Sequence, residues 1–209
     1  MNRLNAVIMA AGQSNRFGAN KLLLPLQGKP VIQHLLDRFP FNLFHQVVLV
    51  YSSDRVETIA QKYPLVLCRN DHPDHGQGLT IRLGVNASND AEGTLFLVAD
   101  QPLLSRATIM TLIEVFLHNR GRIVMPVTDE TPHNPVFFPK SCLPELKELQ
   151  GDVGGKVVIK KHPELIMQVP FENPNEFVDI DTPDTYEWLT KMTVGGERTK
   201  QTKSIQTGQ

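Results

Sequence analysis

The chain has 209 residues, the length of one domain or of one domain with a small lobe. Hydrophobic residues make up 41% and charged residues 21%, which is ordinary for a globular protein, and the net charge of −1 gives no reason to expect binding to nucleic acid or to an acidic membrane. Cys68 and Cys142 stand alone, which argues against a zinc site, and no apolar run reaches the ~18 residues of a membrane span, so we expect a soluble, cytoplasmic protein.

The first part of the chain alternates between predicted strands and predicted helices. Strands are expected at residues 5–10, 46–51, 65–68, 94–99 and 122–126, and helices at about 30–39, 54–63, 79–87 and 105–121, with Ser105 as a cap. The run 94–99 is continuously apolar, which predicts a central strand buried on both faces. Repeated strand–helix units imply a parallel sheet with right-handed crossovers.

The alternation loosens after Pro126. Strands are expected at residues 134–138, 166–170 and 177–180, and helices at 143–149, at 156–161 after a glycine-rich loop, and from Thr182–Pro183 to about 189. Residues 194–209 are polar and predict a disordered tail. No repeat or linker divides the chain before that, so we expect a single domain over residues 1–193.

A small-residue loop follows the first predicted strand. It begins with Ala10, Ala11 and Gly12, and its backbone N–H groups could cradle phosphate oxygens. Arg16 and Lys21 would add positive charge at the carboxyl end of a strand, where open α/β sheets bind ligands. Neither the Walker A pattern nor the dinucleotide fingerprint fits, so an ordinary strand-to-helix turn remains the alternative.

Two groups of carboxylates are candidates for a metal site. Asp100 comes directly after the 94–99 strand, and so faces the same sheet edge as the Gly12 loop. Strand alternation over 177–180 would put Asp179 and Asp181 on one face. Mg²⁺ is often held by one or two carboxylates together with substrate phosphates. Turn formation and helix capping are the structural alternatives.

The run from Ala10 to Leu26 closely resembles the opening signature of the nucleotidyltransferases that attach a nucleotide to molybdopterin. It reads Ala-Ala-Gly-x-Ser-x-Arg-Phe-Gly-x-x-Lys-Leu-Leu-Leu-Pro-Leu. Within this group the chain looks most like the molybdenum cofactor cytidylyltransferases, since the guanylyltransferases typically have Gly-Gly in place of Ala10-Ala11. The resemblance covers about residues 4–189. It implies a three-layer α/β/α, Rossmann-like nucleotidyltransferase fold, with a mainly parallel sheet and an antiparallel C-terminal portion.

The same resemblance implies a role for each matching residue. Catalytic roles would fall to Arg16, Lys21 and Asp100. Binding of the nucleotide and of the pterin substrate would involve Ala10, Ala11, Gly12, Ser14, Gly78, Thr80, Asn134, Asp152 and Lys156. Asp100 and Asp181, with Asp179 as the second choice after Asp181, would bind Mg²⁺, with Mn²⁺ as the alternative ion. The histidines at 72, 75 and 133 lack a metal-site spacing, and we expect them to be loop or surface residues.

The implied reaction is attack by the terminal phosphate of molybdopterin cofactor on the α-phosphorus of CTP, with pyrophosphate leaving. Because a phosphate nucleophile is already ionised at neutral pH, no general base is needed. The expected partners are these two substrates and, transiently, a molybdenum hydroxylase apo-enzyme, with neither nucleic acid nor membrane. Three alternatives remain open: GTP as the donor, a sugar or polyol phosphate as the acceptor, and a non-catalytic protein that binds or delivers the cofactor.

Overall fold

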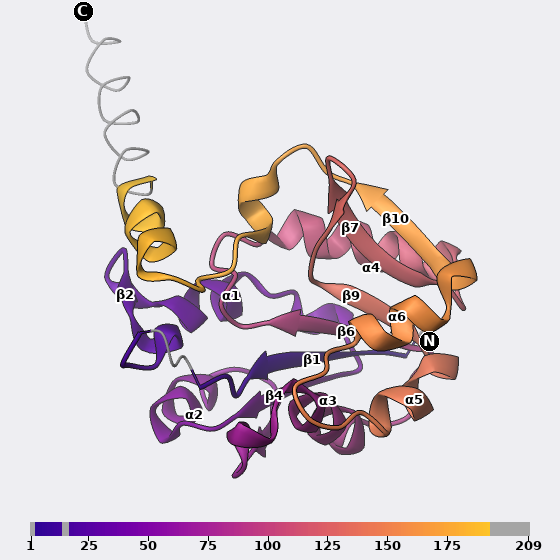
Figure 1. Cartoon of the computed structure of the whole chain (residues 1–209), viewed down its shortest axis with the longest axis horizontal. Helices are drawn as coiled ribbons and strands as arrows, with labels where there is room; N and C mark the ends of the chain where they lie inside the picture. The colour runs from indigo at the N-terminus through magenta and orange to yellow at the C-terminus, as the bar shows by residue number, and fades with distance from the viewer. Residues whose placement is uncertain (1–2, 14–16, 193–209) are drawn as a thin grey trace, which may run out of the picture.

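The computed structural model describes residues 3–13 and 17–192, and its centre is an eight-stranded sheet (Figure 1). The strands of this sheet are β1 (Leu4–Ala10), β4 (Gln46–Tyr51), β5 (Val66–Arg69), β6 (Gly93–Val98), β7 (Ile123–Thr128), β8 (Thr131–Pro132), β9 (Val136–Pro139) and β10 (Ile166–Pro170). Their order is β10-β7-β9-β6-β1-β4-β5, with β8 beside β7. A separate hairpin pairs β2 (Pro25–Leu26) with β3 (Lys29–Pro30).

The sheet has the mixed topology that the resemblance implies. Strands β5, β4, β1 and β6 are parallel to one another, and β10 is parallel to β7. Strand β9 runs antiparallel between β6 and β7, which makes the later part of the chain the antiparallel portion. Strand β6 lies in the middle of the order, as its continuous apolar run predicts. Because β1 and β6 are parallel neighbours, the loops at their carboxyl ends lie at the same sheet edge.

Helices cover both faces of the sheet. They are α1 (Val31–Arg38), α2 (Asp54–Ala60), α3 (Gln77–Ala87), α4 (Arg106–His118), α5 (Leu143–Lys147) and α6 (Lys156–Lys161), and residues 183–192 are also helical. The predicted cap of α4 is confirmed, because the backbone N–H of Thr108 donates to the Ser105 hydroxyl at 3.0 Å. Helix α2 ends at Ala60, short of its predicted end, and the Ser53 side chain makes no capping hydrogen bond. No helix of the described residues has the length and apolar character needed to cross a bilayer.

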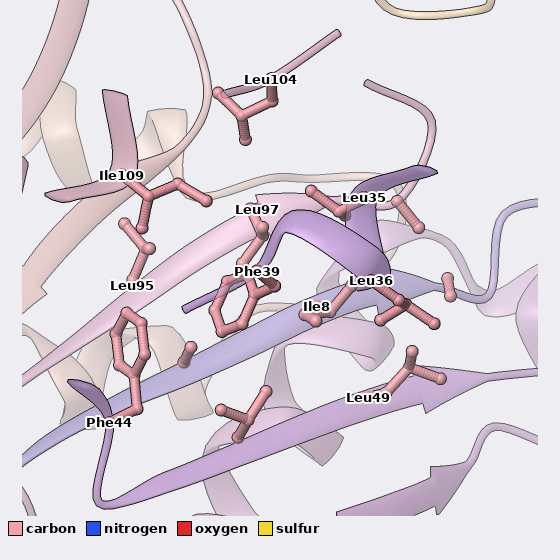
Figure 2. Close-up of a cluster of buried hydrophobic side chains, with 14 of the residues drawn as sticks. Ile8, Leu35, Leu36, Phe39, Phe44, Leu49, Leu95, Leu97, Leu104 and Ile109 are labelled. Carbon is pink, nitrogen blue, oxygen red and sulfur yellow. The ribbon is translucent and has the colours of Figure 1, made fainter. Parts of the chain in front are cut away.

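The strands divide the core into two layers by alternation. On one face Ile8, Leu49 and Leu97 pack with side chains of α1, α2 and α4, and Figure 2 shows part of this layer around Leu35 and Leu36 of α1. The intervening strand residues pack on the other face, against α3, α5 and α6. This alternation is the physical basis of the three-layer arrangement, because the strands β1, β4, β6 and β7 bury both of their faces.

The strand predicted at residues 177–180 is wrong. The 3-10 helix η6 (Pro174–Phe177) precedes an irregular segment in which Ile180 is fully buried. The backbone N–H of Ile180 donates to the carbonyl of Asp100 at 3.1 Å, so this segment bonds to the residue after β6 instead of forming a ladder. Ile180 and Leu189 then pack against Leu26 and Val31, which seats the last helix beside the β2–β3 hairpin (Figure 1). The predicted tail, 194–209, lies outside the described residues.

Candidate active site

A cavity of about 570 Å³ opens at the carboxyl ends of β1 and β6. Residues from segments far apart in the sequence form its wall. Of the residues predicted for the site, those that line it are Ala10, Ala11, Gly12, Lys21, Thr80, Asp100, Asn134, Asp152, Lys156, Asp179 and Asp181. Ser14 and Arg16 lie outside the described residues. The sheet edge therefore gathers small residues, carboxylates and cationic side chains around one space.

Lys21 lies between two carboxylates in this cavity. Its Nζ pairs with Oδ2 of Asp100 in a short contact and with Oδ1 of Asp181 at 2.9 Å. Asn20 caps the short 3-10 helix η1 (Lys21–Leu23) by accepting a hydrogen bond from Leu22 N at 3.0 Å, which orients the start of that turn. Although burial alone would lower the pKa of Lys21, the adjacent charges of Asp100 and Asp181 raise it, so this amine stays protonated.

Burial raises the pKa of two carboxyl groups in the cavity, those of Asp100 and Asp179. Desolvation raises the pKa of Asp100, and it outweighs the opposing effect of the Lys21 charge. Burial, followed by the charge of Asp100, raises the pKa of Asp179 to about 7. One oxygen of Asp179, Oδ1, is buried and has no hydrogen-bond partner among the described residues. A buried carboxylate oxygen without a partner calls for a proton or a cation.

These aspartates fit a hard divalent cation. Asp100 and Asp181 both contact the ammonium of Lys21, so they already converge on a positive group, and the unpartnered oxygen of Asp179 belongs to the same segment as Asp181. Carboxylate oxygens are the ligands that Mg²⁺ and Mn²⁺ prefer. Since Nζ of Lys21 now lies between two of the carboxylates, a cation there would require the lysine side chain to turn away.

The start of α3 and the loop before α6 form another part of the cavity lining. Thr80 lines the cavity, and its hydroxyl accepts a hydrogen bond from buried Asn70 at 3.2 Å. Gly78 is buried and is not part of the lining, and its N–H donates to the carbonyl of Gly151 at 3.0 Å. Asp152 Oδ1 accepts a hydrogen bond from Gln77 N at 3.4 Å, so this carboxylate contacts the first residue of α3.

Sequence reasoning missed the part of the cavity lining formed by Pro73 and Asp74. Pro73 and Asp74 line the cavity together with Gly76 and Gln77, although no site role was predicted for Pro73 or Asp74. The 3-10 helix η3 (Pro73–His75) also brings donor atoms of His72, Asp74 and His75 within 4.8 Å of one another. Both histidines are exposed loop residues, as expected, and the turn brings them closer together than their spacing along the chain suggests. The proline directly after His72 is the sequence signal for such a turn.

Comparison with known proteins identifies the family and agrees with the fold. Residues 6–165 match the family described as the MobA-like NTP transferase domain. The chain is 28% identical over 203 residues to purine catabolism protein PucB of Bacillus subtilis, covering 90% of this chain and 96% of the relative. It is 31% identical over 130 residues to a protein of Haloferax mediterranei named "Probable molybdenum cofactor guanylyltransferase", covering 60% of each chain.

Solved structures share the architecture. A nucleotidyl transferase from Methanothermobacter thermautotrophicus, Mth528, superposes with a TM-score of 0.79 at 21% identity and covers 94% of this chain and 100% of its own. Rv0371c of Mycobacterium tuberculosis, solved as a complex with manganese, has a TM-score of 0.72 at 22% identity, with coverage of 91% and 99%. Since the family match spans most of the chain, the protein belongs to the MobA-like NTP transferase domain family and is a nucleotidyltransferase.

Proposed function

We propose that this nucleotidyltransferase transfers CMP from CTP to the terminal phosphate of molybdopterin cofactor, releasing pyrophosphate and forming a cytosine dinucleotide of the cofactor. The observation that carries the proposal is the Lys21–Asp100–Asp181 cluster in the cavity beside the Gly12 loop. It combines the positive charge needed for phosphates with the carboxylates needed for a divalent cation. A relative named for molybdenum cofactor guanylyl transfer supports this choice of acceptor.

In this mechanism both substrates are anions, so the barrier comes from charge repulsion and from positioning. Mg²⁺ or Mn²⁺ held by Asp100 and Asp181 would supply positive charge to the triphosphate. Lys21, Arg16 and the backbone N–H groups from Gly12 to Ser14 would stabilise the leaving pyrophosphate. No protein group needs to remove a proton, because the attacking phosphate is already ionised.

The acceptor would lie on the other side of the cavity. Asn134 and Lys156 line the cavity, and the amine of Lys156, the first residue of α6, would contact a phosphate of the acceptor. Asp152 keeps the start of α3 in place through the N–H of Gln77, and Thr80 offers its hydroxyl to the nucleotide. We place the reaction in the cytoplasm, with transient delivery of the product to a molybdenum hydroxylase apo-enzyme.

The choice of CTP rests on the first strand. Ala10 and Ala11 line the cavity and are buried, so their methyl groups take up space that glycines would leave open. A pyrimidine needs less room there than a purine. GTP is the second candidate, because the relative from Haloferax mediterranei is named as a guanylyltransferase.

The test is a set of incubations of the full-length protein with molybdopterin cofactor, Mg²⁺ and each NTP in turn, followed by pyrophosphate measurement and mass spectrometry of the product. The proposal predicts pyrophosphate and a cytosine dinucleotide with CTP. A guanine dinucleotide would favour the second candidate. Turnover only with a sugar or polyol phosphate would overturn the acceptor assignment, and binding of cofactor without pyrophosphate release would indicate a delivery protein.

A further inference from the structure

Three potential metal ligands lie together at the rim of the cavity, apart from the aspartates. Donor atoms of His72, Asp74 and His75 all lie within 4.8 Å of one another, and Nε2 of His75 is 4.0 Å from Oδ2 of Asp74. The two imidazole rings stack with centroids 5.0 Å apart and planes inclined by 15°. All three residues are exposed, so no packing requirement explains why they meet.

A hydrogen bond and close backbone packing fix the turn that carries these ligands. The backbone N–H of His72 donates to Oδ1 of Asn70 at 3.0 Å, and Asn70 is 1% exposed. Gly76 has a φ of +84°, and a side chain there would meet backbone atoms of Gly151 and Asp152 at 2.5 Å. The turn therefore packs directly against the loop that contributes Asp152 to the cavity lining. Ligands on a fixed backbone lose less entropy when they bind an ion.

The chemistry of this group differs from that of the aspartate site. Two imidazoles and one carboxylate suit borderline divalent ions such as Zn²⁺, Ni²⁺ or Co²⁺, whereas an all-carboxylate site suits Mg²⁺. The neighbouring Asp71 is already paired with Arg69 at 2.8 Å, which leaves Asp74 as the carboxylate of the cluster. Three protein ligands also leave coordination positions for water or for a substrate group.

We propose that His72, Asp74 and His75 form a second cation site that binds a borderline divalent transition metal at the rim of the nucleotide cavity. Since Asp74 lines that cavity, an ion held there adds positive charge at the mouth through which anionic substrates pass. The site does not depend on the identity of the nucleotide or of the acceptor.

The experiment is a titration of tag-free, full-length protein with Zn²⁺ in excess Mg²⁺ by calorimetry, repeated with Co²⁺ by visible absorption. The natural protein should bind one Zn²⁺, and Co²⁺ should give the ligand-field bands of a nitrogen- and oxygen-coordinated ion. His72→Ala and His75→Ala should each weaken Zn²⁺ binding about 10-fold or more, as loss of one of three ligands implies. The double variant should lose the site.

Two variants serve as controls. His162→Ala removes another exposed histidine that contacts carboxylates, Glu145 and Glu164, and should leave Zn²⁺ binding unchanged. Asp100→Asn should also retain it, since that residue belongs to the other cluster. Circular dichroism checks that each variant is folded. Equal Zn²⁺ binding by the natural protein and the double histidine variant, or its loss in Asp100→Asn alone, would overturn the proposal.

Discussion

Replacing Lys21 with methionine removes the cation from the centre of the aspartate cluster while keeping a side chain of similar length. In the intact protein the Lys21 side chain is only 16% exposed, and its ammonium pairs with Asp100, whose side chain is 10% exposed. The substitution therefore leaves a buried carboxylate without its partner. The second pair, with Asp181, matters less to stability because the Asp181 side chain is 58% exposed.

The size of the effect follows from that burial. Breaking a buried ion pair by removing one partner costs about 3–5 kcal/mol when the other group stays charged. Asp100 can instead take up a proton, because its pKa is already raised by burial and rises further without Lys21. The folded variant then binds a proton that the unfolded chain does not, so its stability falls as pH rises above the ordinary aspartate value of 3.8. We expect a loss of about 3 kcal/mol at pH 8 and about 1 kcal/mol at pH 5.

The assay is urea unfolding of the natural protein and Lys21→Met at both pH values, in EDTA so that no divalent ion binds. The double variant Lys21→Met/Asp100→Asn is the control, and it should recover most of the stability lost at pH 8, because it removes the unpaired charge. An equal loss at pH 5 and pH 8, or no recovery in the double variant, would refute the reasoning and show that Lys21 stabilises the fold by packing alone.

The remaining predictions concern Asp179, the first strand and the rim. In EDTA, Asp179→Asn should stabilise the protein by about 2 kcal/mol at pH 8 and by less at pH 5. Burial raises the folded pKa of Asp179 to about 7, so the carboxylate lowers stability progressively as pH rises from its ordinary pKa of 3.8 to about 7. The ~4 kcal/mol implied by 1.36 kcal/mol per pH unit is halved for partial exposure. An equal gain at both pH values in urea unfolding would count against this prediction. Ala10→Gly/Ala11→Gly should raise the use of GTP relative to CTP, measured as pyrophosphate release, and an unchanged ratio would remove these methyl groups from base selection. Gly76→Ala should lower the free energy of unfolding by at least ~1 kcal/mol more than Gly121→Ala, measured by thermal unfolding. Both glycines have a positive φ, but only at Gly76 would a Cβ atom clash with backbone atoms. Equal losses would show that the backbone around Gly76 moves to make room for the side chain.

The parts of the fold that were predictable are those with an unambiguous period. The run 94–99 is apolar without interruption, and the structure places β6 in the middle of the sheet. From residue 178 on, the segment 177–180 alternates between apolar and polar side chains, as a short strand does. Its backbone hydrogen bonds nevertheless go to Asp100, just after β6, and to the 3-10 turn before it. Local pattern could not distinguish the two, because the partner, Asp100, lies almost 80 residues earlier in the sequence.

The site was predictable where a residue directly follows a strand. Asp100 and the Gly12 loop come after β6 and β1, and the parallel pairing of those strands brings them to one cavity. Two features were not predictable. The ion pairs of Lys21 depend on the path of residues 179–181, and the meeting of His72 with His75 depends on the 3-10 geometry of η3. Spacing along the chain does not reveal either distance.

The central claim, that Asp100 and Lys21 belong to a nucleotidyl-transfer site, is tested most directly by pyrophosphate release from CTP in the presence of molybdopterin cofactor and Mg²⁺. The account predicts release by the natural protein and a loss of about 100-fold or more in Asp100→Asn, because the amide lacks the charge that holds a hard cation. Equal rates and equal Mg²⁺ dependence in a folded Asp100→Asn variant would contradict it.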